Sequence, residues 1–170
     1  MLSFDTRSLE EKAVQVDGQL ASDDPVWKEE DPRPVEPVQV TGRLSTAGPG
    51  RYYFSGRIEG TAAAECRRCL TELRASVDED VQLIFVEPGT EDADDPDMFP
   101  VDERTGEVDL RPAVREHWLL SVPGYALCRE DCQGFCPTCG TDRNNGSCDC
   151  APTSTDPRWD ALRNHGRSAD

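Results

Sequence analysis

The chain has 170 residues, of which 36% are hydrophobic and 31% are charged, and its formal net charge is −16. This length and modest apolar content argue against two full domains and predict one compact core with flexible extensions. The excess of carboxylates opposes non-specific binding to nucleic acid, because that affinity comes from Lys and Arg displacing counterions. The charge favours a basic protein partner, or it serves only to keep the protein soluble.

The start of the chain bears on the expected compartment. Residues 1–7 lack the basic and apolar regions of a secretory signal, and no later stretch approaches the roughly 18 apolar residues of a membrane helix. We therefore expect a cytoplasmic protein that does not associate with membranes. Thiols stay reduced there, so the eight cysteines favour metal binding or catalysis over disulfides. A secreted fragment with disulfides is the alternative.

The first part of the chain predicts an antiparallel hairpin. Alternating valines in residues 12–18 indicate a short strand, and the Pro-rich and acidic residues 21–37 are typical of an extended linker. Residues 38–44 then alternate apolar and polar side chains, and a Gly-Pro-Gly turn at 48–50 leads into a long alternating strand over 52–64. This alternation predicts strands with one buried face.

The alternation resumes over residues 73–85, which places Cys66-Arg67-Arg68-Cys69 in a turn between two antiparallel strands. Residues 88–100 form an expected acidic loop without the glycine and glutamate positions of an EF-hand. A helix capped by Asp109 is expected to reach about Leu120, before Pro123-Gly124. The apolar positions that would place this helix over the sheet are Leu110, Val114 and Trp118.

These elements predict an α+β fold: a small antiparallel β-sheet, a covering helix and a C-terminal cysteine-rich zinc knuckle. We expect residues 1–127 to form the α+β core, including the linker and the acidic loop. Residues 128–150 lack the periodicity of an apolar core, so metal is expected to fold them. Within residues 151–170, an Asp-Pro start at Asp156 predicts a short helix followed by a frayed tail.

The cysteines occur as four close pairs, which is the number needed for two tetrahedral sites with four thiolates each. Two intervening residues let one tight turn present both sulfurs to the same ion. We therefore predict two structural zinc sites. Their ligands are Cys66, Cys69, Cys128, Cys132, Cys136, Cys139, Cys148 and Cys150.

Two assignments of these ligands to sites are open. In the preferred pairing, the hairpin cysteines share an ion with Cys128 and Cys132, and the remaining four form a local knuckle. In the alternative, residues 128–139 form one site, and the hairpin cysteines pair with Cys148 and Cys150. A redox dithiol is disfavoured because Cys66 and Cys69 join two strands instead of opening a helix. Catalytic zinc is disfavoured because four thiolates leave no open position.

Five arginines lie close to cysteines in the sequence and have two possible roles. A site with four thiolates around one zinc ion has a formal charge near −2, which nearby guanidinium groups offset. The same side chains are candidates for contact with RNA or a protein partner. They are Arg67, Arg68, Arg74, Arg129 and Arg143.

The chain resembles the YceD family, also called DUF177, of bacterial proteins linked to the accumulation of 23S rRNA. The segments that carry the resemblance are residues 65–70, 106–110, 128–140, 148–150 and 156–159. The resemblance implies a role in the synthesis, processing or stability of 23S rRNA, with no catalytic residues to carry over. The implied partners are a basic protein of the large ribosomal subunit, the 23S rRNA precursor, or both.

The expected function is therefore that of a non-enzymatic ribosome biogenesis factor that binds a ribosomal protein or pre-rRNA. One alternative is an acidic, zinc-containing chaperone or adaptor for a basic ribosomal protein, which the net charge favours over direct RNA contact. The other is an RNA-processing enzyme. The sequence lacks a P-loop, a nucleotide-binding glycine motif and a Ser/His/Asp set, so we expect no small-molecule substrate.

Overall fold

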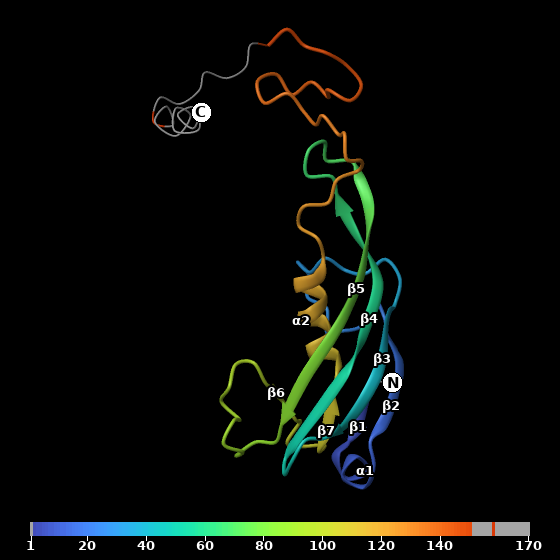
Figure 1. Cartoon of the computed structure of the whole chain (residues 1–170), viewed down its shortest axis with the longest axis vertical. Helices are drawn as coiled ribbons and strands as arrows, with labels where there is room; N and C mark the ends of the chain where they lie inside the picture. The colour runs from blue at the N-terminus through green and yellow to red at the C-terminus, as the bar shows by residue number, and fades with distance from the viewer. Residues whose placement is uncertain (1, 151–157, 159–170) are drawn as a thin grey trace, which may run out of the picture.

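The computed structural model describes residues 2–150 and Arg158, which form a mostly β structure with two sheets (Figure 1). One sheet has five strands in the order β2-β3-β4-β5-β6, and the other consists of β1 and β7. The elements in chain order are β1 (Ser3–Asp5), α1 (Thr6–Glu11), β2 (Val14–Leu20), β3 (Val38–Thr46), β4 (Arg51–Glu65), β5 (Glu72–Val86), β6 (Phe99–Pro100), β7 (Glu107–Asp109) and α2 (Arg111–Ser121).

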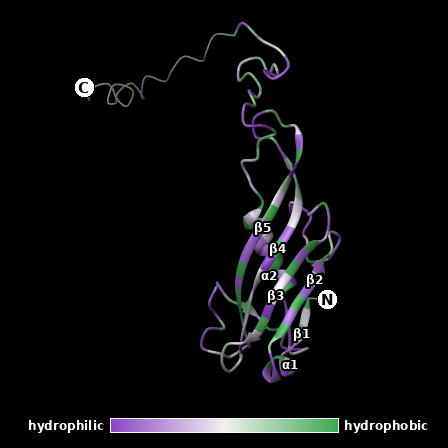
Figure 2. Cartoon of the chain, turned by 45° about the vertical axis from the view of Figure 1, so that its right-hand side comes forward, coloured by the Kyte–Doolittle hydropathy of each residue, from purple (hydrophilic) through white to green (hydrophobic). Residues whose placement is uncertain are grey.

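The large sheet is an antiparallel meander from β2 to β5, as the alternating sequence predicts. Along β5 the apolar positions at 75, 77, 81, 83 and 85 are buried, and most of the positions between them are exposed. Figure 2 shows the corresponding alternation of apolar and polar residues along the strands. The short strand β6 joins β5 in parallel. With two residues, it is too short to produce a periodic signal.

Helix α2 covers one face of this sheet and completes the core (Figure 1). Its predicted apolar positions, Leu110, Val114 and Trp118, are all fully buried. The helix begins at Arg111 with Leu110 as its N-cap, so the cap expected at Asp109 is one residue too early. The Asp109 carboxylate still accepts a hydrogen bond from the Arg111 backbone N–H at 3.0 Å. Asp109 therefore satisfies a backbone N–H group of the first helical turn from a position outside the helix.

The segment expected to be an extended linker, residues 21–37, packs against α2. Trp27 is only 4% exposed and meets Trp118 edge-on, with ring centroids 6.2 Å apart. The indole N–H of Trp118 donates to the Pro32 carbonyl at 2.7 Å, and Arg115 forms a two-point ion pair with Asp31 at 2.6 and 2.8 Å. The prolines and carboxylates of the expected linker give no sign that Trp27 anchors the segment to α2.

The β4–β5 hairpin extends beyond the rest of the sheet. Strand β3 pairs with β4 only as far as Gln39 opposite Glu59, whereas β5 follows β4 to Glu65 opposite Glu72. Beyond Glu59, the other edge of β4 is met by Pro34 opposite Ala62 and by a hydrogen bond from Val35 to Thr61. A two-stranded ribbon is only marginally stable in water. The end of this hairpin therefore needs further support.

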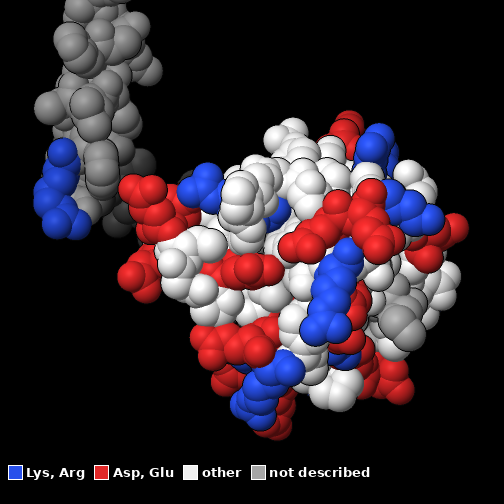
Figure 3. Space-filling view, turned by 90° about the horizontal axis from the view of Figure 1, so that it is seen from below, with Lys and Arg blue, Asp and Glu red and all other residues white. Residues whose placement is uncertain are grey.

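The end of the molecule opposite the cysteines carries charges of both signs (Figure 3). Figure 3 views the end opposite the cysteines, where carboxylates are interspersed with Lys and Arg side chains.

In the part of the chain that the structure describes, no helix has the length and apolarity to cross a membrane. The helix expected from Asp156 lies outside the described residues.

Candidate metal centres

The eight cysteines gather into two groups of four, and within each group the sulfur atoms lie within 4.8 Å of one another. The first tetrad is Cys66, Cys69, Cys128 and Cys132. The second tetrad is Cys136, Cys139, Cys148 and Cys150. This grouping is the preferred pairing of the sequence analysis, and it contradicts the alternative that joined residues 128–139 in one site.

The sulfur separations fit a tetrahedral ion. The Cys66 and Cys132 sulfurs are 3.7 Å apart, and the Cys69 and Cys128 sulfurs are 3.6 Å apart. Four ligands at about 2.3 Å from a tetrahedral zinc ion are separated from one another by about 3.8 Å. A disulfide requires about 2.0 Å, and all eight thiols are free. The first tetrad therefore has the dimensions of a four-thiolate metal site.

The hairpin tip, residues 66–71, holds the first two ligands in a tight turn. The Leu70 backbone N–H donates to the Cys66 carbonyl, and the Cys66 N–H donates to the Thr71 carbonyl, both at 2.8 Å. The Thr71 hydroxyl lies 3.2 Å from the Cys69 sulfur. Leu70 adopts a left-handed φ of 55°, the one such value at a non-glycine residue in the described part of the chain. The turn thus needs this conformation directly after its second cysteine.

The second tetrad repeats this turn in a different part of the chain. The Gly140 N–H donates to the Cys136 carbonyl at 2.9 Å, and the Cys136 N–H donates to the Thr141 carbonyl at 2.8 Å. Thr141 places its hydroxyl 3.2 Å from the Cys139 sulfur, and Gly140 has a φ of 74°. A Cys-x-x-Cys-x-Thr pattern is present at both places in the sequence, and this signal predicts the shared geometry.

The two tetrads differ in burial. Three ligands of the first tetrad are almost fully buried, and Leu73 packs against them. In the second tetrad only Cys136 is buried, Cys139 is exposed, and the other two cysteines are half-buried. The first tetrad is therefore part of a small core of its own at the hairpin tip, whereas the second lies near the surface.

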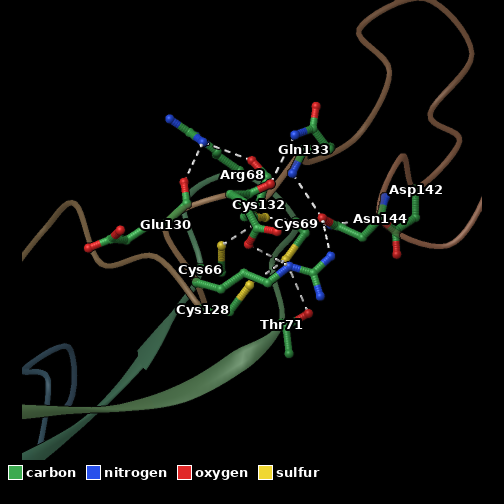
Figure 4. Close-up of polar contacts among 12 residues, drawn as sticks. Cys66, Arg68, Cys69, Thr71, Cys128, Glu130, Cys132, Gln133, Asp142 and Asn144 are labelled. Carbon is green, nitrogen blue, oxygen red and sulfur yellow. Dashed lines mark hydrogen bonds and ion pairs between the residues drawn. The ribbon is translucent and has the colours of Figure 1, made fainter.

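Hydrogen bonds join the loop that carries the second tetrad to the first tetrad and its turn (Figure 4). The Asn144 side-chain amide donates to the Cys132 sulfur at 3.5 Å, and its carbonyl oxygen accepts the Gln133 backbone N–H at 2.8 Å. The Phe135 N–H donates to the Arg68 carbonyl at 3.0 Å. Gly134 allows this close approach, because a Cβ atom at that position would lie 2.5 Å from the same carbonyl oxygen. The loop of the second tetrad thus rests on the first.

In each tetrad, hydrogen bonding lowers the pKa of both thiols of the Cys-x-x-Cys turn, Cys66 and Cys69 in the first and Cys136 and Cys139 in the second. Backbone hydrogen bonding, chiefly at Cys128, lowers the pKa of the Cys66 thiol to about 6. Backbone hydrogen bonding, chiefly at Cys139, lowers the pKa of the Cys136 thiol to about 5. Removal from water raises the pKa of Cys128 to about 12, and the hydrogen bond with Cys139 raises that of Cys150 to about 12. Metal binding must therefore release protons from the last thiols.

The five arginines singled out in the sequence make different contacts. Arg68 donates to the Cys132 carbonyl at 2.8 Å, and Arg143 lies 3.6 Å from the Cys136 sulfur, where its charge offsets a thiolate. Arg74 pairs with Glu36, and Arg129 pairs with Asp131. Arg67 instead stacks on the Tyr125 ring, with its guanidinium carbon 4.0 Å from the centroid. Sequence reasoning missed Tyr125, which contacts Arg67 from a distant part of the chain, and Asn144, which lies 12 residues after its partner Cys132. Neither contact leaves a local pattern in the sequence.

A family model for the large ribosomal RNA subunit accumulation protein YceD matches residues 54–164. This match covers more than half of the chain and includes both tetrads. The chain belongs to the YceD family. The resemblance inferred from the cysteine motifs is thereby confirmed.

Curated relatives extend the similarity beyond that region. The protein YlbN of Bacillus subtilis is 29% identical over 133 residues, which cover 78% of this chain and 76% of YlbN. Rv2926c of Mycobacterium tuberculosis is 28% identical over 111 residues, or 64% of this chain and 52% of that protein. A chloroplastic protein of Zea mays named large ribosomal RNA subunit accumulation protein YCED homolog 1 is 26% identical over 149 residues, covering 71% of this chain and 50% of its own length. No solved structure gives a significant match.

Proposed function

We propose that this chain is a cytoplasmic ribosome biogenesis factor that supports the accumulation of 23S rRNA by binding, without catalysis. The observation that carries the proposal is the family match, because the matched residues include both tetrads and the hairpin that presents them. A binding role also agrees with the tetrads themselves, whose four thiolates leave no position for a water or a substrate.

Two structural zinc ions are part of this proposal. The first tetrad would clamp the end of a marginal two-stranded ribbon, and the second would fold residues 134–150, which have little apolar core. Metal analysis of anaerobically purified protein should find two zinc ions per chain. A content below about one ion per chain would contradict a structural role for zinc.

The function itself is tested by depletion in the host. Loss of the protein should lower the ratio of 23S to 16S rRNA and leave unprocessed 23S precursor ends, and the wild-type gene should restore both. An unchanged ratio would remove the large-subunit role. The same strain carrying a Cys66→Ser gene tests whether the metal-stabilised tip is needed for the activity.

The net charge of −16 supports one form of this function over another. Negative potential attracts a basic ribosomal protein and repels the phosphate backbone of RNA. We therefore place a basic protein of the large ribosomal subunit first among the partners and the 23S rRNA precursor second. Salt-dependent binding that survives ribonuclease supports the protein, and ribonuclease-sensitive binding supports the RNA.

A further inference from the structure

Exposed apolar side chains gather around the hairpin tip. In the described part of the chain, four of the exposed large apolar side chains belong to segments that meet there: Leu70, Tyr125, Leu127 and Phe135. Two backbone hydrogen bonds bring these segments together, from Arg67 to the Ala126 carbonyl at 2.9 Å and from Phe135 to the Arg68 carbonyl at 3.0 Å. Apolar surface grouped in this way, and not scattered singly, is typical of a site for a partner.

A hollow borders two members of this group, Tyr125 and Leu127. It has a volume of about 370 Å³ and is lined by Arg67, Arg68, Tyr125 and Leu127. Tyr125 is 73% exposed, yet the Arg67 guanidinium stacks on its ring and orients it. Tyr and Arg are the residue types that contribute most to binding at protein interfaces. The hollow therefore has the composition of an interface centre.

Two carboxylates lie next to the tip on the hairpin, where they line a second, separate hollow with Arg74. Glu65 and Glu72 lie directly opposite each other across the β4–β5 ladder, and both are exposed. Like charges in this position repel each other, and neither glutamate has an ion pair with another residue that the structure describes. Arg74, which lines the same stretch of the hairpin, pairs with Glu36 instead. A cation from a partner would relieve this repulsion.

We propose that the tip surface, formed by Glu65, Arg67, Leu70, Glu72, Tyr125 and Leu127, docks a basic segment of a partner protein. An apolar side chain of the partner fills the hollow beside Tyr125, and its Lys or Arg side chains meet Glu65 and Glu72. The inference rests on the proposed function, whose partner it locates. Protein is favoured over RNA because the paired glutamates and the net charge of −16 repel phosphate.

Binding measurements on the full, zinc-loaded chain test this surface. The probes are basic proteins of the host large ribosomal subunit, purified individually without RNA and titrated by calorimetry. Tyr125→Ala should weaken binding of the partner by about tenfold or more, as expected for the centre of an interface. Tyr125→Phe should retain most of the affinity, because it keeps the ring under Arg67.

A matched pair of charge reversals separates local contact from bulk attraction. Glu65→Lys with Glu72→Lys and Glu91→Lys with Asp94→Lys change the net charge equally, but the second pair lies in the acidic loop far along the chain. The first pair should weaken binding at least tenfold more than the second. Zinc content and circular dichroism equal to wild type confirm that each variant is folded.

The outcomes distinguish this inference from the proposed function. Equal loss with both charge pairs, or no loss with Tyr125→Ala, overturns the tip surface. So does binding of single-stranded 23S rRNA oligonucleotides that depends on Arg67 and Tyr125 while no protein binds. If the Tyr125→Ala gene restores the 23S to 16S ratio fully, the surface is wrong and the biogenesis role stands. If depletion leaves that ratio unchanged, the biogenesis role itself fails.

Discussion

The two tetrads share one local turn but differ in what surrounds it. The first tetrad closes a hairpin that continues into the main sheet, and three of its ligands are buried. Among the residues that the structure describes, no hydrogen bond ties the second tetrad to a strand of that sheet, and its loop contacts the first tetrad and its turn through Gly134 and Asn144. Identical ligand chemistry therefore has two structural roles: one site extends the core, and the other depends on the first.

The largest expected effect comes from removing a buried ligand. Cys66→Ser should abolish metal binding at the first tetrad and weaken the second, because residues 134 and 144 lose the surface on which they rest. Metal analysis should then find fewer than one zinc ion per chain, compared with the two that we expect in the wild type.

The matched change is Cys139→Ser at the exposed turn. It should remove the second ion alone, leaving one per chain and an unchanged melting temperature for the sheet. Equal losses of metal in Cys66→Ser and Cys139→Ser would show that the two sites do not depend on each other in the order proposed.

A pair of glycine substitutions tests the contact between the tetrads. Gly134→Ala places a methyl group 2.5 Å from the Arg68 carbonyl and forces a left-handed φ on alanine, so it should cost about 3 kcal/mol. Gly140→Ala has a left-handed φ as well, but nothing lies within 4 Å, so its cost should be about 1 kcal/mol. Competition with a zinc chelator measures both. If both substitutions weaken zinc binding equally, the close contact between Gly134 and the Arg68 carbonyl does not contribute to it.

Removing the ion pair between Asp31 and Arg115 tests whether the stability of the sheet is independent of metal binding at the tetrads. Asp31→Asn should lower the free energy of unfolding by about 2 kcal/mol at neutral pH and leave the zinc content unchanged. A fall in zinc content would show that metal binding at the tetrads depends on the packing around Asp31.

The same pair predicts a pH dependence. The side-chain hydrogen bond with Arg115 is the main cause that holds the pKa of Asp31 below its usual value. The contribution of this ion pair to the free energy of unfolding is therefore fully present above the unfolded-state pKa of Asp31, about 3.9. It is lost as the pH falls through the lower folded-state pKa. The difference in unfolding free energy between wild type and Asp31→Asn should shrink over that range. A constant difference would contradict the role of the ion pair.

The smallest effect is expected at Leu70, which occupies the position held by Gly140 in the second turn. Its φ of 55° is unfavourable for a side chain with a Cβ atom. Leu70→Gly should stabilise the tip by about 0.5 kcal/mol, since relief of this strain slightly exceeds the added entropy of the unfolded chain. Thermal unfolding of the zinc-loaded protein checks this. A destabilised variant would mean that the exposed Leu70 side chain has contacts that outweigh the strain.

Sequence reasoning succeeded where a regular pattern reports on burial. Strands β3 to β5 followed from alternation, and the core positions of α2 followed from the four-residue repeat. The structure brings the closely spaced cysteines together in two groups of four that could hold a metal ion, and their grouping is that of the preferred of the two assignments.

Elements without such a pattern were missed. Helix α1 has six residues, and β1 and β7 have three each, so none carries a measurable period. Trp27 lies among prolines and acidic residues, where composition alone indicates a spacer. The stack of Arg67 on Tyr125 joins residues that become neighbours only after the chain folds. Long-range contacts of single side chains leave no local trace in one sequence.

The length of the β4–β5 ribbon has a geometric consequence. Fifteen residues in each strand, at about 3.3 Å per residue, give a span of about 50 Å from the acidic loop to the cysteines. The ribbon thus separates the hairpin tip from the acidic loop at the other end of the sheet. A partner bound at the proposed tip surface would therefore lie about 50 Å from the acidic loop at the other end of the ribbon.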